Sequence, residues 1–225
     1  MSYLQTWPAD ERPREKLLSK GAQSLSDSEL LAIFLRTGTK GKNVIDLSRE
    51  IIKYFGSLKL LLSASEEEFC TFKGLGMAKY AQLQACLEMG QRHIAEEISK
   101  QDAIQNPSQV KRYVQSRLIS KQNEVFAAMF LDNQHHVIAF EELFFGTVNA
   151  SSVHPRVVLQ RALFHNAAAV IVAHNHPSGV SEPSLADIDI TKTLKSSLAM
   201  IDVRLLDHLV VAAHQVTSLA ERGQI

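Results

Sequence analysis

Two histidines and an aspartate in the stretch Val172–Asp187 have the residue types and spacing of a metal site. The apolar run before them, residues 167–173, is rich in small and β-branched residues and predicts a buried strand. Because side chains alternate along a strand, His174 and His176 point to the same side. A helical pattern follows, and Asp187 falls on its first turn. Two imidazoles and one carboxylate form a three-ligand zinc set with a fourth position left for water, as in catalytic zinc sites.

The same residues also have a purely structural interpretation. Ser184 and Asp187 fit a helix N-cap with an acidic residue at the third helical position, which needs no metal. Two histidines at a strand end can also occur without a metal, and an H-x-H pattern alone is a weak indication of a metal site. The combination is much more specific. Both interpretations of Ser184 can hold together, because a cap would fix the turn that aims Asp187.

The stretch from residue 174 to residue 187, H-N-H-P-S-G-V-S-E-P-S-L-A-D, resembles the H-x-H-x7-S-x-x-D signature of the JAMM (MPN-type) zinc metalloproteases. Three other segments, V-H-P-R at 153–156, N-A-A-A at 166–169 and L-D-H at 206–208, resemble the bacterial RadC family, named historically for DNA repair. The resemblance covers nearly the whole chain. It implies one Zn²⁺ per chain, with three protein ligands: His174, His176 and Asp187.

The resemblance also implies catalytic residues and an activity. In JAMM enzymes a glutamate between the first helix and the first strand of the domain is the general base, and Glu124 matches that position. Glu141 and Glu142 compete for this role, but they lie inside the second strand. Ser184 matches the family serine, whose hydroxyl helps to hold the tetrahedral intermediate. The implied activity is a metallopeptidase or isopeptidase that uses a zinc-activated water on a peptide or protein substrate.

The second half of the chain alternates strands and helices, which predicts an α/β domain. Strands are expected at 124–131, 137–145, 148–153, 167–173, 205–212 and 216–220. The JAMM resemblance implies a mixed sheet of the cytidine-deaminase-like type. Short capped helices fill the first half, and a polar stretch ending in Asn-Pro predicts a linker at 99–107. The predicted domains are a small all-α domain at 1–101 and a JAMM/MPN zinc-binding domain at 102–225.

A glycine-rich segment at 72–81, F-K-G-L-G-M-A-K-Y-A, resembles a helix-hairpin-helix element. In its families this element presents backbone amides and nearby lysines to DNA phosphate without reading sequence. Glycines allow close backbone approach, and the helix that follows can hold an anion at its N-terminus. The implied DNA contacts are Lys73, Gly74, Gly76 and Lys79. The alternative is a tight turn between packed helices, which the scarcity of local cations and the acidic run at 66–68 favour.

Composition narrows the function classes. Lys+Arg and Asp+Glu number 24 each, so no overall field attracts nucleic acid or acidic lipid. No apolar run approaches the roughly 20 residues of a membrane span, and the N-terminus does not read as a secretory signal. Cys70 and Cys86 are too far apart for metal-ligand spacing, which predicts reduced, packed thiols. We therefore expect a cytoplasmic protein with no membrane association.

Three functions remain open at this level. The first is the zinc-dependent hydrolase described above. The second is a DNA-binding repair or recombination factor whose metal domain is non-catalytic, with DNA bound through the N-terminal domain. The third is an inactive interaction scaffold, like the MPN domains that lack ligands. The intact ligand set argues against the third.

Overall fold

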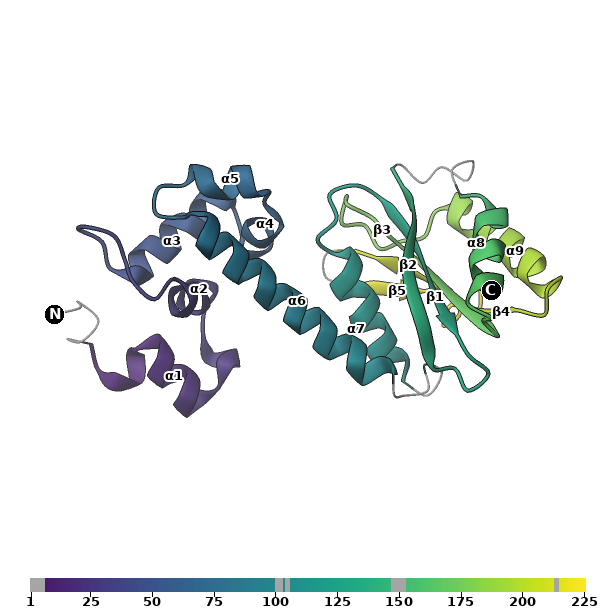
Figure 1. The fold of residues 1–225 in the computed structure, drawn as a ribbon, viewed down its shortest axis with the longest axis horizontal. Helices are drawn as coiled ribbons and strands as arrows, with labels where there is room; N and C mark the ends of the chain where they lie inside the picture. Colours follow the sequence, from purple (N-terminus) through teal and green to yellow (C-terminus); the bar gives the residue numbers. More distant parts are fainter. Residues whose placement is uncertain (1–6, 100–102, 104–105, 147–152, 213–214) are drawn as a thin grey trace. The chain divides into compact units, whose positions relative to one another are not determined.

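A computed structural model describes residues 7–99, 103, 106–146, 153–212 and 215–225. The chain divides into two compact units, Met1–Glu88 and Met89–Ile225, with helix α6 (Met77–Ser99) running from one into the other (Figure 1). The predicted domain boundary between residues 101 and 102 lies outside the described residues and stays a prediction.

The first unit is all helical in its described part. Its helices are α1 (Pro13–Lys20), α2 (Asp27–Leu35), α3 (Val44–Phe55), α4 (Leu58–Ser63), α5 (Glu66–Thr71) and the start of α6. Side-chain caps start several of them: Ser26 and Ser65 form capping boxes, and Asn43 accepts a hydrogen bond from the Asp46 amide. The apolar faces of these helices meet in one core around Leu31, Ile51 and Phe69.

The second unit contains a five-stranded mixed sheet in the order β2-β1-β3-β4-β5. Its elements are α7 (Pro107–Leu118), β1 (Val125–Leu131), β2 (Val137–Phe145), α8 (Pro155–Phe164), β3 (Ala169–Asn175), α9 (Leu185–Ala199), β4 (Arg204–Val211) and β5 (Val216–Ser218). Only the β3–β4 pair is parallel. Five predicted strands appear, and the strand expected at 148–153 falls almost entirely outside the described residues. The α/β prediction is confirmed.

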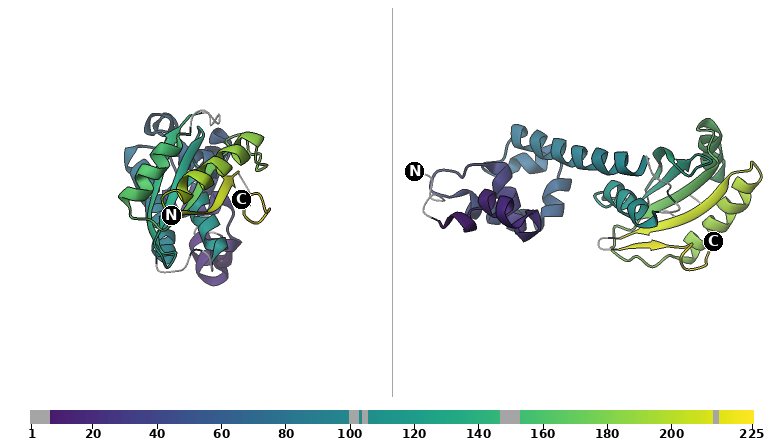
Figure 2. Two further views of the ribbon diagram at one scale, coloured as in Figure 1. Left: turned by 90° about the vertical axis from the view of Figure 1, so that its right-hand side faces the viewer. Right: turned by 90° about the horizontal axis from the view of Figure 1, so that it is seen from below.

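Helices cover both faces of this sheet. Helix α7 lies on one face, and α8 and α9 lie side by side on the other (Figure 1; Figure 2, left). Residues alternate between two separate cores, as strand geometry requires. Ala127, Met129 and Ile171 belong to the α7 core, whereas Phe126, Phe130 and Val172 belong to the α8–α9 core. None of the helices in the described part of the chain has the length and apolar character needed to cross a membrane.

This layering decides where the polar residues of the second unit go. His174 continues the alternation of Val170 and Val172, so its ring lies on the α9 side of the sheet. The turn after β3 leads directly into α9, whose first turn carries Asp187. Strand β4 runs parallel to β3 and places His208 opposite Val172. Three elements therefore deliver polar side chains to one place under α9.

Candidate metal centre

The side chains of His174, His176 and Asp187 converge at the end of β3. The two Nε2 atoms are 2.9 Å apart, the Nε2 of His174 is 3.3 Å from Oδ1 of Asp187, and the Nε2 of His176 is 3.8 Å from Oδ2. A tetrahedral zinc ion with bonds of about 2.0–2.1 Å would hold its ligand atoms roughly 3.3 Å apart. The distances to the two Asp187 oxygens lie on either side of that value, and one ligand atom of each residue lies within 4.8 Å of the others, so the three residues form a group that could hold a metal ion.

The turn after β3 orients His176. Its Nδ1 lies 2.7 Å from the carbonyl oxygen of Val180. A carbonyl can only accept a hydrogen bond, so Nδ1 carries the proton and the lone pair is on Nε2, which faces the other two ligands. Gly179, at φ 83°, allows the tight turn, and its amide donates to the carbonyl of His176 at 3.0 Å.

Asp187 divides its two oxygens between two tasks. Oδ2 accepts hydrogen bonds from the amide and the hydroxyl of Ser184, both at 2.7 Å, and the Ser184 hydroxyl accepts in turn from the Asp187 amide at 3.2 Å. This capping box starts α9 and confirms the structural interpretation of Ser184. Because Oδ2 is held by the cap, Oδ1 is the oxygen that remains for an ion.

Burial controls the charge of the centre. His174 is fully buried, and this desolvation lowers its pKa to about 4, although Asp187 acts in the opposite direction. A neutral imidazole is the form that binds a metal. Asp187 is also buried, whereas the side chain of His176 keeps 15% of its exposure. The centre is therefore closed on the side of His174 and open to solvent beside His176.

Glu124 directly precedes β1, whose pairing with β3 joins Phe126 to His174. Residues opposite each other in an antiparallel pair share a face, and alternate residues of one strand do too. Glu124 is half-buried, and its carbonyl accepts a hydrogen bond from Gly146 at 2.9 Å. By strand alternation Glu124 falls on the side of the sheet that carries Phe126 and His174, and its role as the base stays a prediction.

The competing glutamates of β2 are engaged elsewhere. Glu141 binds Arg161 of α8 and, at 2.8 Å, the Nε2 of His165. Arg161 holds the pKa of Glu141 below its usual value. Glu142 lies opposite Ala127, on the α7 side of the sheet, and pairs with Lys121 at 2.7 Å. Both glutamates are thus occupied by partners outside the candidate metal centre, and the assignment of the base to Glu124 stays a prediction.

Asn175, between the two histidines, points to the opposite face of the sheet, as strand alternation predicts. Its Oδ1 accepts from the Val125 amide at 2.7 Å, and its Nδ2 donates to the carbonyls of Lys121 and Asn123 at 3.3 and 3.1 Å. One buried amide therefore holds the segment on both sides of Glu124. Sequence reasoning missed this role, because these partners are about 50 residues away.

Asp207 and His208 form no pair with each other through their side chains. The Asp207 carboxylate accepts from the Ser218 hydroxyl at 2.6 Å and the Ala220 amide at 3.0 Å, and burial raises its pKa. The His208 ring points to the other face and contacts His174. Of these two residues, His208 alone contacts a candidate ligand through its side chain.

The N-terminal glycine hairpin is a compact turn. Gly74 has φ 103°, and a Cβ there would lie 3.1 Å from the Thr39 methyl. The Lys79 ammonium donates to the Gly74 carbonyl at 2.6 Å, whereas Lys73 is exposed. Gly76 has nothing within 4 Å of an added Cβ. Of the four predicted DNA contacts, Lys79 is thus occupied within the turn, and Lys73 is the exposed cation.

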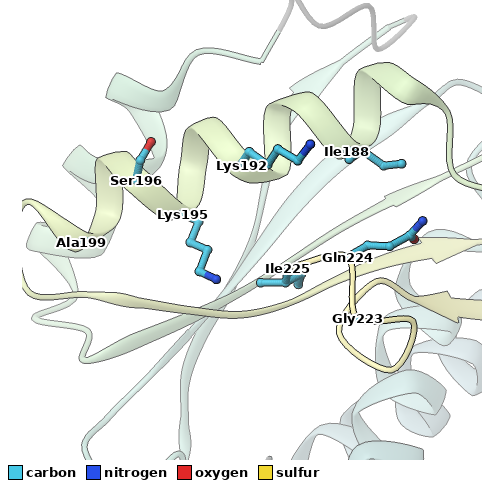
Figure 3. Close-up of a pocket in the computed structure, with 8 residues that line it drawn as sticks. All are labelled: Ile188, Lys192, Lys195, Ser196, Ala199, Gly223, Gln224 and Ile225. Carbon is cyan, nitrogen blue, oxygen red and sulfur yellow. The ribbon is translucent and has the colours of Figure 1, made fainter.

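A separate pocket of about 690 Å³ lies along another side of α9, against the segment Gly223–Ile225 (Figure 3). Lys195 extends from α9 toward Ile225, whereas Lys192 lies alongside the helix. None of the three candidate ligands lines the pocket, and neither does Glu124. The polar centre under α9 is therefore distinct from this cavity.

Comparison with known proteins agrees with this architecture. The model of the RadC-like JAB domain matches residues 104–224, and that of the UPF0758 N-terminal domain matches residues 4–81. A UPF0758 protein of Nitrosococcus oceani is 58% identical over 217 residues, which is 96% of this chain and 97% of the relative. UPF0758 proteins of Thioalkalivibrio sulfidiphilus and Vibrio atlanticus are both 59% identical, covering 96% and 97% of this chain and 97% of each relative. With its helical first unit and mixed sheet, the chain belongs to the RadC family of UPF0758 proteins with a RadC-like JAB domain.

Proposed function

We propose that this protein is a zinc-dependent hydrolase of peptide or isopeptide bonds. The observation that carries the proposal is the convergence of His174, His176 and Asp187, whose ligand atoms all lie within 4.8 Å of one another. When bound there, zinc supplies Lewis-acid chemistry: it lowers the pKa of a water molecule and polarises a carbonyl group. The JAB superfamily includes metalloproteases, which supports this reaction class.

In the proposed reaction, Glu124 is the proton carrier. It accepts a proton from the attacking water as the water oxygen bonds to the substrate carbonyl carbon. It then delivers this proton to the nitrogen of the leaving amine as the carbon–nitrogen bond breaks. The water oxygen remains on the new carboxyl group.

Ser184 has two tasks in this proposal. Its hydroxyl holds the Asp187 carboxylate in the capping box. The predicted contact with the substrate oxyanion requires that hydroxyl hydrogen to turn from Asp187 to the substrate, by rotation about the carbon–oxygen bond. The Ser184 amide continues to hold Asp187 meanwhile.

The surroundings of the centre are consistent with a peptide substrate. Val180 and Leu185, which border the turn between the histidines and Asp187, are 58% and 81% exposed. Exposed apolar side chains beside a polar centre offer contacts to the side chains of a polypeptide.

Metal analysis of purified protein tests the proposal first. We expect one zinc ion per chain in the wild type and none in the His174→Ala/His176→Ala variant. Cleavage of peptide and isopeptide-linked libraries should then require zinc and disappear in Glu124→Gln, which keeps the shape of the side chain but not its basicity. Full zinc occupancy in the double histidine variant would refute the metal centre. Unchanged cleavage by Glu124→Gln would refute the assignment of the base.

DNA binding by the first unit is a second candidate, and one structural observation favours it. The hairpin glycine Gly74 packs against Thr39, so the basic loop at 36–42 adjoins the hairpin and the exposed Lys73. That loop borders a pocket of about 610 Å³ lined in part by Arg36 and Lys42. Two nearby loops with exposed cations could contact a phosphate backbone.

A charge-reversal experiment tests this candidate. Lys73→Glu/Lys40→Glu should weaken duplex DNA binding and reduce its salt dependence by about two counterions. Lys79 is left intact because its ammonium holds the turn. Lys192→Glu/Lys195→Glu, with the same change of net charge in the second unit, is the matched control. Equal affinity and salt slope in all three proteins would remove the basis for this function.

A further inference from the structure

A chain of hydrogen bonds runs behind His174, away from the candidate metal position. The Nδ1 of His174 is 2.8 Å from the Nε2 of His208, and the Nδ1 of His208 is 2.6 Å from the hydroxyl oxygen of Thr191. That hydroxyl is 2.5 Å from the main-chain carbonyl oxygen of Asp187. All three side chains in this chain are fully buried. The path begins at one candidate ligand and ends on the backbone of another.

The chemistry of the end group fixes the direction of every bond in this path. The Asp187 carbonyl can only accept, so the single O–H of Thr191 must donate to it. The Thr191 oxygen then has only lone pairs for His208, and the proton of the neutral His208 ring must be on Nδ1. The Nε2 of His208 is consequently an acceptor, which requires the proton of His174 to be on Nδ1. The lone pair of His174 is left on Nε2, toward His176 and Asp187.

Besides each other and Thr191, the two rings contact His176 and Asp187, which face Nε2 of His174, and Phe126. Phe126 stacks on His174 at 6.3 Å between ring centroids and meets His208 edge-on at 5.6 Å. Its ring has no hydrogen-bonding group, so it fixes the planes of the imidazoles without affecting their protons. The path through His208 and Thr191 therefore favours the proton on Nδ1 of His174 against the Asp187 carboxylate, which lies farther away, at 3.3 Å from Nε2.

We propose that His208 and Thr191 are positioning residues that transmit the polarity of the Asp187 carbonyl to His174 and keep its Nε2 available for the metal. This inference rests on the proposed metal centre. Asp187 then has two roles in the candidate metal centre. Its carboxylate is a ligand, and its main-chain carbonyl sets the tautomer of His174, which is another ligand. Partners behind a metal-bound histidine typically change metal affinity by about 10- to 100-fold when they are removed.

The same helix provides a matched control for Thr191. The hydroxyl of Thr193 donates to the Asp189 carbonyl, four residues earlier, at 2.9 Å, just as that of Thr191 donates to Asp187. Thr193 is exposed, and its hydroxyl has no hydrogen bond to any histidine that the structure describes. Replacing either threonine by valine removes one hydroxyl from α9, and only Thr191→Val breaks the path to His174.

The test is Zn²⁺ affinity, measured by competition with a chromophoric chelator. We expect Thr191→Val to bind Zn²⁺ about 10- to 100-fold more weakly than wild type, Thr193→Val to bind it equally well, and Thr191→Ser to restore the affinity. Wild-type affinity in Thr191→Val would overturn the positioning role while leaving the metal centre intact. Wild-type affinity in His174→Ala would instead refute the metal centre itself.

A second measurement needs no variant and applies if Thr191→Val fails to fold. Side-chain ¹⁵N NMR of the metal-free wild type at neutral pH distinguishes the two neutral imidazole tautomers. We expect protonated Nδ1 and unprotonated Nε2 at both His174 and His208. A proton on Nε2 of His208 would reverse the direction of the path and overturn the proposal.

Discussion

The two glycine-containing turns of this protein, the hairpin around Gly74 and the turn around Gly179, use their polar groups in opposite ways. At the hairpin, the Lys79 ammonium turns back to the carbonyl of Gly74 and closes the structure on itself. At the turn after β3, backbone and side-chain bonds hold the outer atoms of His176 and Asp187, so that their remaining nitrogen and oxygen atoms face one point. In the hairpin the polar groups are used up in hydrogen bonds within the turn. In the turn after β3, each candidate ligand keeps one nitrogen or oxygen atom that the turn does not use, and these atoms are available to bind an ion.

The largest effect should follow from Asp187→Ala. This change removes a ligand oxygen, and we expect Zn²⁺ affinity to fall by more than the roughly 100-fold limit for outer partners. It also removes the acceptor of the capping box, so the metal-free protein should lose about 1 kcal/mol in its free energy of unfolding. Chelator competition and urea denaturation measure the two effects. Asp189→Ala, at an exposed position two residues later, is the control. If Asp187→Ala and Asp189→Ala changed Zn²⁺ affinity and the free energy of unfolding equally, Asp187 would have no special role in the turn after β3.

Acidification should destabilise the metal-free protein. The folded-state pKa of His174 is lowered from 6.5 to about 4, and burial also lowers that of His208. Unfolding lets these rings take up protons, so the unfolded state binds more protons below pH 6.5 and stability falls as the pH decreases. The expected slope is at most about 1.4 kcal/mol per pH unit for each ring.

The interval from pH 6.5 to 4.5 suits this measurement, because Glu141, whose pKa is lowered from 4.5, loses its stabilising charge only at lower pH. Asp207, whose pKa is raised by burial, acts in the opposite direction, so the two rings must outweigh it for the expected fall. Urea denaturation at several pH values in the presence of a chelator measures it. A free energy of unfolding that is constant or rises with acidification would show that the rings of the candidate centre are not buried in neutral form.

Removing the amide of Asn175 should separate stability from metal binding. Asn175→Ala leaves the buried Val125 amide without its acceptor, and we expect a loss of about 1–3 kcal/mol in the free energy of unfolding. Zn²⁺ affinity should change little, since the amide lies on the other face of the sheet. Asn133→Ala, at an exposed position, is the control. Weaker Zn²⁺ binding by Asn175→Ala together with an unchanged free energy of unfolding would contradict the prediction that Asn175 serves stability and not metal binding.

The smallest effect is expected at the hairpin. Gly74→Ala places a Cβ at positive φ and 3.1 Å from the Thr39 methyl, which should cost about 1–2 kcal/mol. Gly76→Ala, with open space around it, should cost less. Thermal denaturation of the two variants measures the difference. Because the first unit holds no part of the candidate metal centre, neither change should alter zinc content.

Much of this architecture was predictable from local patterns. Strand alternation placed His174 and His176 on one side, and the capping pattern of Ser184 and Asp187 correctly marked the start of α9. Similar caps marked the starts of helices in the first unit. These features depend on neighbours within a few residues, so the sequence alone contains their cause.

Other features depend on how distant segments meet. The contact of His208 with His174 requires the parallel register of β3 and β4, and the contact with Thr191 requires α9 to lie directly above β4. The different partners of Glu141 and Glu142 follow from their faces on β2, which only the β1–β2 register defines. No spacing rule in a single sequence specifies such registers.

The division of labour within the Asp187 carboxylate has a practical consequence. Helix α9 begins at the same carboxylate that would bind the ion, so ion binding should reinforce the fold at this point. A ligand that binds only the folded chain raises its stability by RT ln(1 + [L]/Kd). A rise in melting temperature could therefore report which ions, and later which inhibitors, occupy the centre before any substrate has been identified.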